Sequence, residues 1–297
     1  MTKRQKRKLL IYIVILIIAA IGFISDRIEK STVVEDIPEN TPVSYSYVHF
    51  LDVGQGDCTL IETHDGKFGL IDASTQNASY KILNYLENEG VEELEFVLFT
   101  HPHEDHIGCG DEVLENFNVK TVYMNDKTEN TAAYHRLINA VSQSKQEKGT
   151  KVLRPLYGNT FFLGDIRFDV LSDGSDFEGL NDPSICLRME LGKSTFIFTG
   201  DAEKIVEYSI LEKGINVSAE VFKLGHHGSS TSNSDAFLDA VSPDIAITSC
   251  GIDNDYGHPH DEIVDAINRR GIIHRRTDLD GDILLAFSEN TISILKN

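Results

Sequence analysis

The chain has 297 residues, of which 41% are hydrophobic and 25% are charged, a composition typical of a globular protein with a large core. Its formal net charge is -20, which excludes proteins that bind nucleic acid through a broadly basic surface. A phosphate-bearing ligand therefore requires local positive charge, such as bound metal ions.

The N-terminal part predicts a membrane segment. Residues 1–8, MTKRQKRK, form a basic head before the uncharged segment LLIYIVILIIAAIGFI at 9–24. This segment is slightly shorter than the roughly 20 apolar residues of a transmembrane helix. A basic head before an apolar segment keeps the N-terminus in the cytoplasm and directs the C-terminal remainder of the chain across the membrane. We expect a single-pass anchor in the cell membrane with its domain outside; the alternative is a cleaved signal peptide and a secreted protein.

The polar residues 25–44, which include two prolines, predict a linker, and residues 45–297 predict one domain in which helices and strands mix. Apolar periodicity predicts helices at 78–89, 130–148, 202–213, 233–240 and 261–270. Strands are predicted at 45–53, 57–63, 68–73, 95–100, 121–124, 166–172, 184–191, 194–199, 221–224, 244–248, 283–287 and 292–295.

The segment FTHPHEDHIGCG at 99–110 carries three histidines and two carboxylates directly after a predicted buried strand. Histidines two apart in an extended segment point the same way, so His101 and His103 can hold one metal ion. Asp105 and His106, at the start of the next helix, can turn toward a second ion. Imidazole and carboxylate ligands together suit zinc, manganese or iron. The alternative interpretation is a polar helix cap.

Further metal-ligating side chains follow other predicted strands. TFIFTGDAE ends in a Gly-Asp pair with Asp201, VFKLGHHGSS contains His226 and His227, and DYGHPH contains His258 and His260. Seven of the eleven histidines thus fall into three clusters, which independent surface histidines would not do. The pattern favours a site with two metal ions.

Taken together, these motifs resemble the metallo-β-lactamase superfamily and, within it, the extracellular domain of ComEC-type DNA-uptake proteins. The resemblance covers about residues 47–287. It rests on FLDVGQGD (50–57), THPHEDHIG (100–108), FTGDAE (198–203), KLGHHGSSTS (223–232) and YGHPH (256–260). It implies an α+β fold, a four-layered αββα sandwich with the site along one edge of its paired sheets, preceded here by the N-terminal apolar helix.

The resemblance also implies a role for each matching residue. The implied ligands are His101 and His103 for the first metal, Asp105, His106 and His226 for the second, and Asp201 as the bridge. His227 would face the substrate phosphate, although the choice between His226 and His227 stays open. Many superfamily hydrolases supply a third histidine to the first metal. Here the only histidine at 108–199 is His135, in a predicted helix.

The region expected to supply that third ligand reads GLNDPSICL and offers Asn181, Asp182 and Ser184 instead. This departure fits the ComEC-like group and resembles phosphorylcholine esterases, and it argues against β-lactam hydrolysis. We expect Asn181 and Ser184 to contact substrate. Ser229, Ser230, Arg276 and Thr277 are further candidates, because arginines gather in INRRGIIHRRTDLDG and the resembling family brings this segment near the mouth of the site.

Two divalent ions, zinc or manganese, can clamp a phosphodiester and lower the pKa of a bridging water toward 7, giving a hydroxide that attacks phosphorus. Asp105, His227 and His258 are the candidate catalytic residues, since histidine can contact phosphate or protonate the leaving oxygen. Asp57 either orients a ligand histidine or holds the amides of its own turn.

The expected function is that of an exported, membrane-anchored hydrolase for phosphodiesters, with single-stranded DNA as the favoured substrate and no obligate protein partner. One alternative is a phosphodiesterase for cell-wall phosphorylcholine or other small diesters. Another is a non-catalytic metal-binding module. The four cysteines lack C-x-x-C spacing and predict neither a zinc finger nor a redox motif.

Overall fold

The computed structural model describes residues 44–295. The predicted basic head, apolar segment and almost all of the predicted linker lie outside these residues. Across residues 44–295, no helix combines the length and apolar character needed to cross a membrane. All four cysteines are buried and free.

Two β-sheets form the centre of the fold. Within the described residues, the first has eight strands in the order β15-β14-β1-β2-β3-β4-β5-β6, and the second has seven in the order β13-β12-β11-β10-β9-β8-β7. The strands of the first sheet are β1 (Ser46–Phe50), β2 (Thr59–Glu62), β3 (Phe68–Ile71), β4 (Glu93–Leu98), β5 (Asn118–Tyr123), β6 (Lys151–Leu153), β14 (Ile283–Phe287) and β15 (Ile292–Leu295). Those of the second are β7 (Thr160–Leu163), β8 (Ile166–Ser172), β9 (Cys186–Leu191), β10 (Ser194–Phe198), β11 (Val221–Lys223), β12 (Ile245–Thr248) and β13 (Ile273–Arg276).

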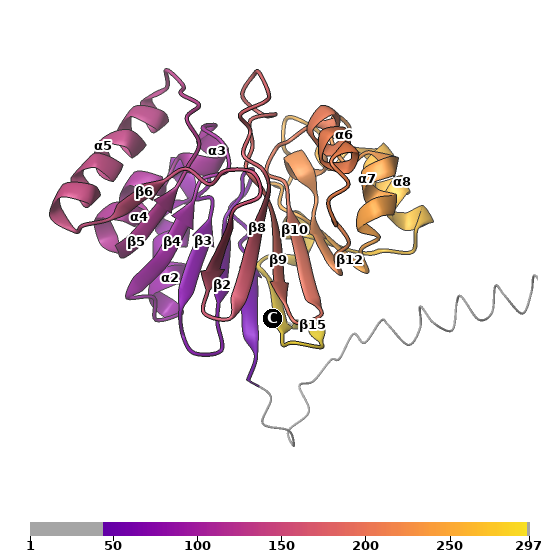
Figure 1. The fold of residues 1–297 in the computed structure, drawn as a ribbon, viewed down its shortest axis with the longest axis horizontal. Coiled ribbons are helices and arrows are strands. Elements are labelled where there is room, and N and C mark those ends of the chain that lie inside the picture. Colours follow the sequence, from indigo (N-terminus) through magenta and orange to yellow (C-terminus); the bar gives the residue numbers. More distant parts are fainter. Residues whose placement is uncertain (1–43, 296–297) are drawn as a thin grey trace, which may run out of the picture.

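Helices cover the outer face of each sheet (Figure 1). The helices are α2 (Ser79–Asn88), α3 (Glu104–Ile107), α4 (Gly110–Asn116), α5 (Ala132–Glu147), α6 (Lys204–Glu212), α7 (Asp235–Val241), α8 (Asp261–Arg269) and α9 (Thr277–Asp280), with 3-10 turns η1 (Gln76–Ala78) and η2 (Gly225–Gly228). One apolar core lies between the sheets, a second under α2, α4 and α5, and a third under α6, α7 and α8. The predicted mixed architecture of two sheets with helices is therefore confirmed.

The helices form where one apolar face can be buried. In α8, Ile263, Ala266 and Ile267 recur at the i, i+3, i+4 spacing and are all buried. Helix α7 begins after Ser234, whose hydroxyl accepts a hydrogen bond from the backbone N–H of Phe237. These local signals explain why the predicted helices agree with the structure to within a few residues.

Several short elements were not predicted. They are β6, β7, α4, β13 and α9. Strand β13 has the sequence IHRR and is half-buried throughout. Among residues 44–295 it pairs only with β12, at the edge of the second sheet, so it needs no apolar run to be stable.

Strands β3 to β6 are parallel in the first sheet, and β10 to β13 are parallel in the second. The segments that follow β4, β10 and β11 carry the predicted metal ligands. Gly56 has a φ of +146° and packs against the segment that follows β4. A Cβ at this position would come within 2.6 Å of the Asp105 carbonyl oxygen. The FLDVGQGD turn can therefore pack against the histidine loop only with glycine at this position.

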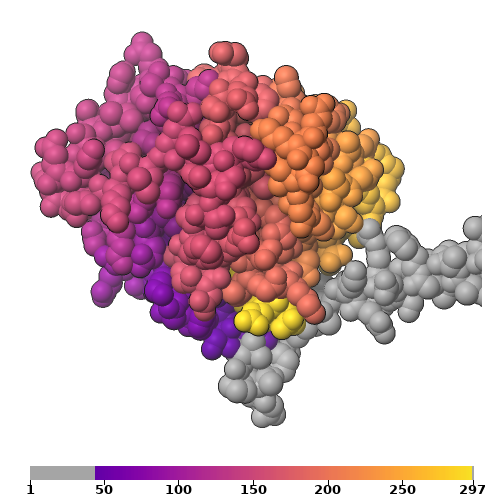
Figure 2. Space-filling model, viewed as in Figure 1, coloured from indigo at the N-terminus to yellow at the C-terminus, as the bar shows by residue number. Residues whose placement is uncertain are grey.

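The two sheets come mainly from successive parts of the chain, but the last strands return to the first sheet. Strand β14 pairs antiparallel with β1, and β15 pairs with β14. Figure 2 shows the surface at this junction, where the yellow C-terminal residues lie close to the indigo N-terminal ones.

Candidate metal centre

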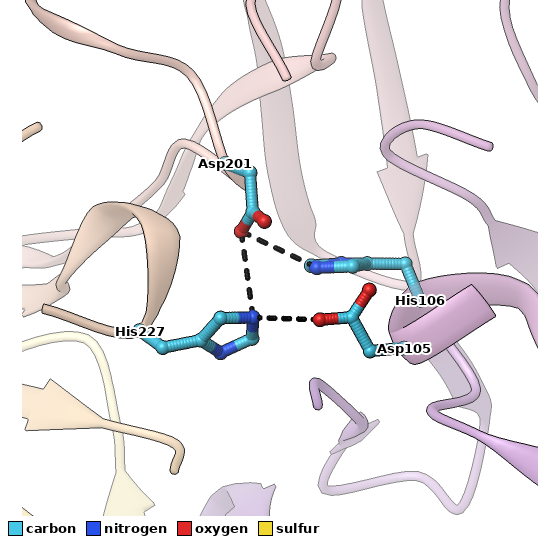
Figure 3. Close-up of side chains that lie close together, drawn as sticks. All are labelled: Asp105, His106, Asp201 and His227. Carbon is cyan, nitrogen blue, oxygen red and sulfur yellow. Dashed lines mark hydrogen bonds and ion pairs between the residues drawn. The ribbon is translucent and has the colours of Figure 1, made fainter. Parts of the chain in front are cut away.

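Two groups of potential metal ligands share the carboxylate of Asp201. One consists of Asp105, His106, Asp201 and His227, and the other of His101, His103 and Asp201. Within each group the ligand atoms all lie within 4.8 Å of one another. Figure 3 shows the first group, in which Asp201 faces both imidazoles and His227 also faces Asp105. Such shared placement is the geometry required of a bridging ligand.

The first of the three segments follows β4. His101 is buried, and its Nε2 lies 3.0 Å from His103 Nδ1 and 3.7 Å from Asp201 Oδ2. Burial and the nearby charge of His106 lower the pKa of His101 well below its ordinary value. Its imidazole is therefore neutral, the form that binds metal ions.

His106 is oriented from behind by Asp72, a residue that sequence reasoning missed. His106 Nδ1 donates to Asp72 Oδ2 at 2.8 Å, and Asp72 also accepts hydrogen bonds from the backbone N–H and hydroxyl of Thr100. The Nε2 atom consequently points forward and lies 3.3 Å from Asp201 Oδ1. A carboxylate directly after the buried strand 68–71 is a signal that points to this residue.

Asp201 follows β10, and a hydrogen bond from its backbone N–H fixes its position. Its N–H donates to the hydroxyl of Ser184 at 3.1 Å. Although burial opposes it, the charges of His106 and His227 hold the pKa of Asp201 well below its usual range. The carboxylate is therefore ionised despite being 1% exposed.

His227, rather than His226, lies in the four-residue group. Its Nδ1 donates to the Ser249 carbonyl oxygen at 3.0 Å, and its Nε2 lies 3.2 Å from Asp105 Oδ2. His226 is partly exposed, with Nε2 3.6 Å from Asp201 Oδ2. Both histidines are in the left-handed region, with φ of 50° and 54°. The sequence prediction puts His226 at the second metal but leaves the choice between the two open; the four-residue group contains His227.

The charges of this group are strongly coupled. Although burial opposes both shifts, Asp201 and Asp57 raise the pKa of His227 to about 10, and His106 and His227 lower that of Asp105 to about 2. His106 likewise has a raised pKa, because the carboxylates around it outweigh its burial. Divalent ions would replace the protons on these two imidazoles.

Asp57 lies behind His227 and is paired with a buried lysine. Its Oδ1 lies 3.4 Å from His227 Nδ1 and 2.9 Å from Lys223 Nζ. Burial raises the pKa of Asp57, but the charges of Lys223 and His227 outweigh it and keep the carboxyl ionised. Asp57 is thus close enough to orient His227.

A pocket of about 360 Å³ opens onto both ligand groups. It is lined by Gln55, His103, Glu104, Asp105, Asn181, Asp201, His226, His227, Tyr256 and His258. Gln55, Glu104 and Tyr256 were not among the predicted site residues. The Tyr256 ring is 66% exposed and stacks on His258, with centroids 5.6 Å apart. Burial and the charge of His227 lower the pKa of His258 to about 4, so its imidazole is neutral.

Of the two candidates from GLNDPSICL, only Asn181 lines the pocket. Its Nδ2 donates to Glu203 Oε1, and its Oδ1 has no hydrogen-bond partner in the described part of the chain. Ser184 is fully buried behind Asp201. Its hydroxyl therefore positions the backbone of a ligand and does not face the pocket.

The four candidates nearer the C-terminus also lie outside the pocket lining. Ser229 and Thr277 are buried, and the Thr277 hydroxyl bonds to the backbone of Cys250. The Ser230 N–H donates to His260 Nδ1. Arg276 forms a two-point ion pair with Asp278. These contacts give Ser230, Arg276 and Thr277 structural partners.

The residues at the centre fit metal ions. His106 Nε2 and Asp201 Oδ1 are buried and have no well-aligned hydrogen bond among residues 44–295, an arrangement that is unfavourable unless another group completes it. Imidazole and carboxylate are the ligands that zinc and manganese take. Asp72 and the Ser249 carbonyl supply the hydrogen bonds that usually orient such ligands, and the Asp57 carboxylate lies close to His227.

Comparison with known proteins agrees with this geometry. The family profile described as "Metallo-beta-lactamase superfamily" matches residues 51–252. "Competence protein ComA" of Neisseria gonorrhoeae is 30% identical over 262 residues, covering 88% of this chain and 33% of that protein. "ComE operon protein 3" of Bacillus subtilis is 28% identical over 254 residues, covering 80% of this chain and 32% of that protein. The chain thus spans about a third of the length of these relatives.

Among solved structures, the metallo-β-lactamase fold protein YhfI from Bacillus subtilis superposes with a TM-score of 0.57 at 12% identity. The superposition covers 82% of this chain and 100% of that one. At this level of identity the similarity concerns the fold alone.

Proposed function

The chain belongs to the metallo-β-lactamase superfamily, and on this premise we propose that it is a metal-dependent phosphodiesterase that cleaves DNA in a competence system. The superfamily consists mostly of metal-dependent hydrolases, and the related proteins from Bacillus and Neisseria carry competence names. The observation that carries the proposal is the Asp201 carboxylate shared by two ligand groups at the floor of one open pocket.

In this proposal the first ion is held by His101, His103 and Asp201, and the second by Asp105, His106, Asp201 and His227. Zinc and manganese are the ions that suit these ligands. When bound, such a pair of ions lowers the pKa of a water molecule and polarises a phosphoryl oxygen.

The protein's own groups bind and orient the substrate. Neutral His258 and the amide of Asn181 are both at the pocket wall, where each can donate a hydrogen bond to a phosphodiester oxygen. The exposed ring of Tyr256 offers a face on which a nucleobase can stack. Asp72 and the Ser249 carbonyl keep His106 and His227 in the tautomers that leave Nε2 free for a metal.

The proposal also assigns a location. The basic head at 1–8 and the apolar segment at 9–24 favour an anchor that exports the domain. An exported nuclease of net charge -20 would draw its phosphate-binding charge from the metal ions and not from its surface.

One observation favours a second candidate, a small phosphodiester with a cationic group such as phosphorylcholine. Glu104 and Tyr256 both line the pocket, and a carboxylate and an exposed aromatic ring in one pocket can together bind a quaternary ammonium. The substrate would then be held by its cation, with the diester directed at Asp201.

The test offers single-stranded DNA, bis-p-nitrophenyl phosphate and glycerophosphocholine to the purified chain with zinc or manganese. Asp201→Asn is the inactive variant, and Asp65→Asn, a remote exposed carboxylate, is the matched control. Cleavage of DNA by the wild type and the control, lost in Asp201→Asn, supports the nuclease. Cleavage of glycerophosphocholine alone favours the second candidate. Metal binding without cleavage of any of the three contradicts both.

A further inference from the structure

A second set of potential metal ligands lies outside the catalytic centre, where β1 and β2 meet the C-terminal end of α2. His49, Glu62 and Glu89 each offer one ligand atom, and these atoms all lie within 4.8 Å of one another. The chemistry of the set, one imidazole and two carboxylates, is that of a zinc site.

The three elements bring these side chains to one place because of the strand register. Tyr47 pairs with Glu62 and His49 with Leu60, so His49 and Glu62 share the face of the sheet that α2 covers. On the helix side, Tyr85 and Glu89 are four residues apart and therefore lie on the same side of α2.

The buried imidazole of His49 points its Nε2 into this set. The side chain is 3% exposed, and Nε2 has no hydrogen-bond partner among the described residues. Its nearest carboxylate oxygen, Glu62 Oε2, is 3.7 Å away, which is too far for a hydrogen bond. Two ligands at about 2.0–2.2 Å from one tetrahedral zinc ion lie roughly 3.4 Å apart, so the spacing fits a shared ion.

The other ring nitrogen of His49 is already held. Its Nδ1 lies 2.8 Å from the Tyr85 hydroxyl, and the two rings meet edge to face at 84°. When Nδ1–H donates to the tyrosine oxygen, the lone pair of Nε2 is left for a metal, as is usual for histidine ligands.

We propose that His49, Glu62 and Glu89 bind a zinc ion that ties β1 and β2 to the end of α2, with Tyr85 as a positioning residue. Glu89 is exposed at the surface, so the ion can enter from solvent and keep a water molecule as its fourth ligand. If the three residues do not bind zinc, they form only an ion pair between His49 and Glu62, and added zinc does not stabilise this part of the chain.

The experiment counts zinc bound to the full chain by equilibrium dialysis and mass spectrometry, in an Asp201→Asn background that weakens the catalytic centre. His49→Gln removes the buried ligand, and His64→Gln, an exposed histidine beyond the end of β2, is its matched control. We expect His49→Gln to bind one zinc fewer than the background, and His64→Gln to bind the same number. Equal binding in both variants would overturn the proposal.

A substitution at the surface provides a second test in case the chain with His49→Gln does not fold. Glu89→Gln changes an exposed side chain and should weaken this zinc site at least tenfold while leaving the fold intact. Zinc should also raise the denaturation midpoint of the background chain, and this rise should be smaller in Glu89→Gln. An unchanged rise in Glu89→Gln would contradict its role as a ligand. The result is independent of whether the catalytic centre cleaves DNA.

Discussion

Asp72 Oδ2 lies 2.8 Å from His106 Nδ1, and this contact fixes the direction in which His106 presents its other nitrogen. Asp72 is 1% exposed and also accepts two hydrogen bonds from Thr100, so its carboxylate cannot move aside. The orientation of a metal-ligating histidine is therefore set by a residue that does not itself face the pocket.

Asp72→Asn should lower zinc affinity at the catalytic centre by roughly 10- to 100-fold, because the amide cannot hold His106 in the same tautomer. Competition with a chelating dye measures this affinity. Asp173→Asn, a buried aspartate that accepts hydrogen bonds from the backbone of Tyr157 and Ser175 and is in neither ligand group, is the control. Equal affinities in the two variants would show that Asp72 does not orient a ligand.

The adjacent histidines can be told apart by paired substitutions. His227→Asn should remove one bound metal ion, since His227 Nε2 lies in the four-residue group. His226→Asn should change metal content less, because its partly exposed ring lies at the pocket wall. Metal content after dialysis decides between them, and the opposite ranking would restore the prediction made from the sequence.

The buried pair of Asp57 and Lys223 should be sensitive to losing one partner. Lys223→Met leaves the Asp57 carboxylate without its lysine and should lower the free energy of unfolding by about 3–5 kcal/mol. The double variant Asp57→Asn, Lys223→Met should lose distinctly less. Urea unfolding followed by circular dichroism measures the free energy of unfolding of both variants. An equal or larger loss in the double variant would mean that the two residues are not coupled.

Tyr256 tests the nature of the substrate. Tyr256→Ala should raise KM for single-stranded DNA about tenfold, equivalent to ~1.4 kcal/mol of lost base stacking. Tyr256→Phe keeps the ring and should leave KM for single-stranded DNA unchanged. Neither variant should change KM for bis-p-nitrophenyl phosphate, which has no nucleobase. A similar KM for DNA in all three proteins would exclude stacking on this ring.

The shifted pKa of His274 should make the stability of the protein depend on pH. Burial and the charge of Arg276 lower its pKa to about 4 from an ordinary 6.5. Above pH 6.5 the imidazole is neutral in both states and contributes nothing. Between pH 6.5 and 4 the unfolded chain binds a proton that the folded chain does not, so stability falls as the pH falls.

The loss due to His274 should reach about 2 kcal/mol at pH 5 relative to pH 7.5. His274→Gln keeps a hydrogen-bonding group near Thr248 and should reduce the loss by this amount. The free energy of unfolding of both proteins is measured by urea titration at the two pH values, with a chelator present throughout. An identical loss in wild type and variant would mean that His274 titrates normally.

Much of the fold could be predicted from the sequence, and so could the family. The resemblance to the metallo-β-lactamase superfamily and to ComEC-type proteins is confirmed. The histidine loop could be located because it follows the buried strand β4, a purely local signal. Strand β13 could not be predicted in the same way, because it is stabilised by pairing with β12 and not by its own apolar residues.

Within the site, residue type did not reveal which way each side chain points. His226 and His227 are chemically equal, and two left-handed residues decide which imidazole joins Asp105 and Asp201. Ser184, like Thr277, has its hydroxyl engaged inside the fold. Such contacts depend on segments far apart in the chain, which a motif does not specify.

The return of β14 to the first sheet has a consequence for how this protein is made. Strand β1 leads into the turn that supports Asp105 and Asp57, yet its neighbour β14 is synthesised only after the whole second sheet. During translation β1 can pair with β2, but its other edge stays open until residues 283–287 emerge from the ribosome. Pairing between segments so far apart in the chain slows folding, and here it completes the sheet beside the strand that leads to Asp57.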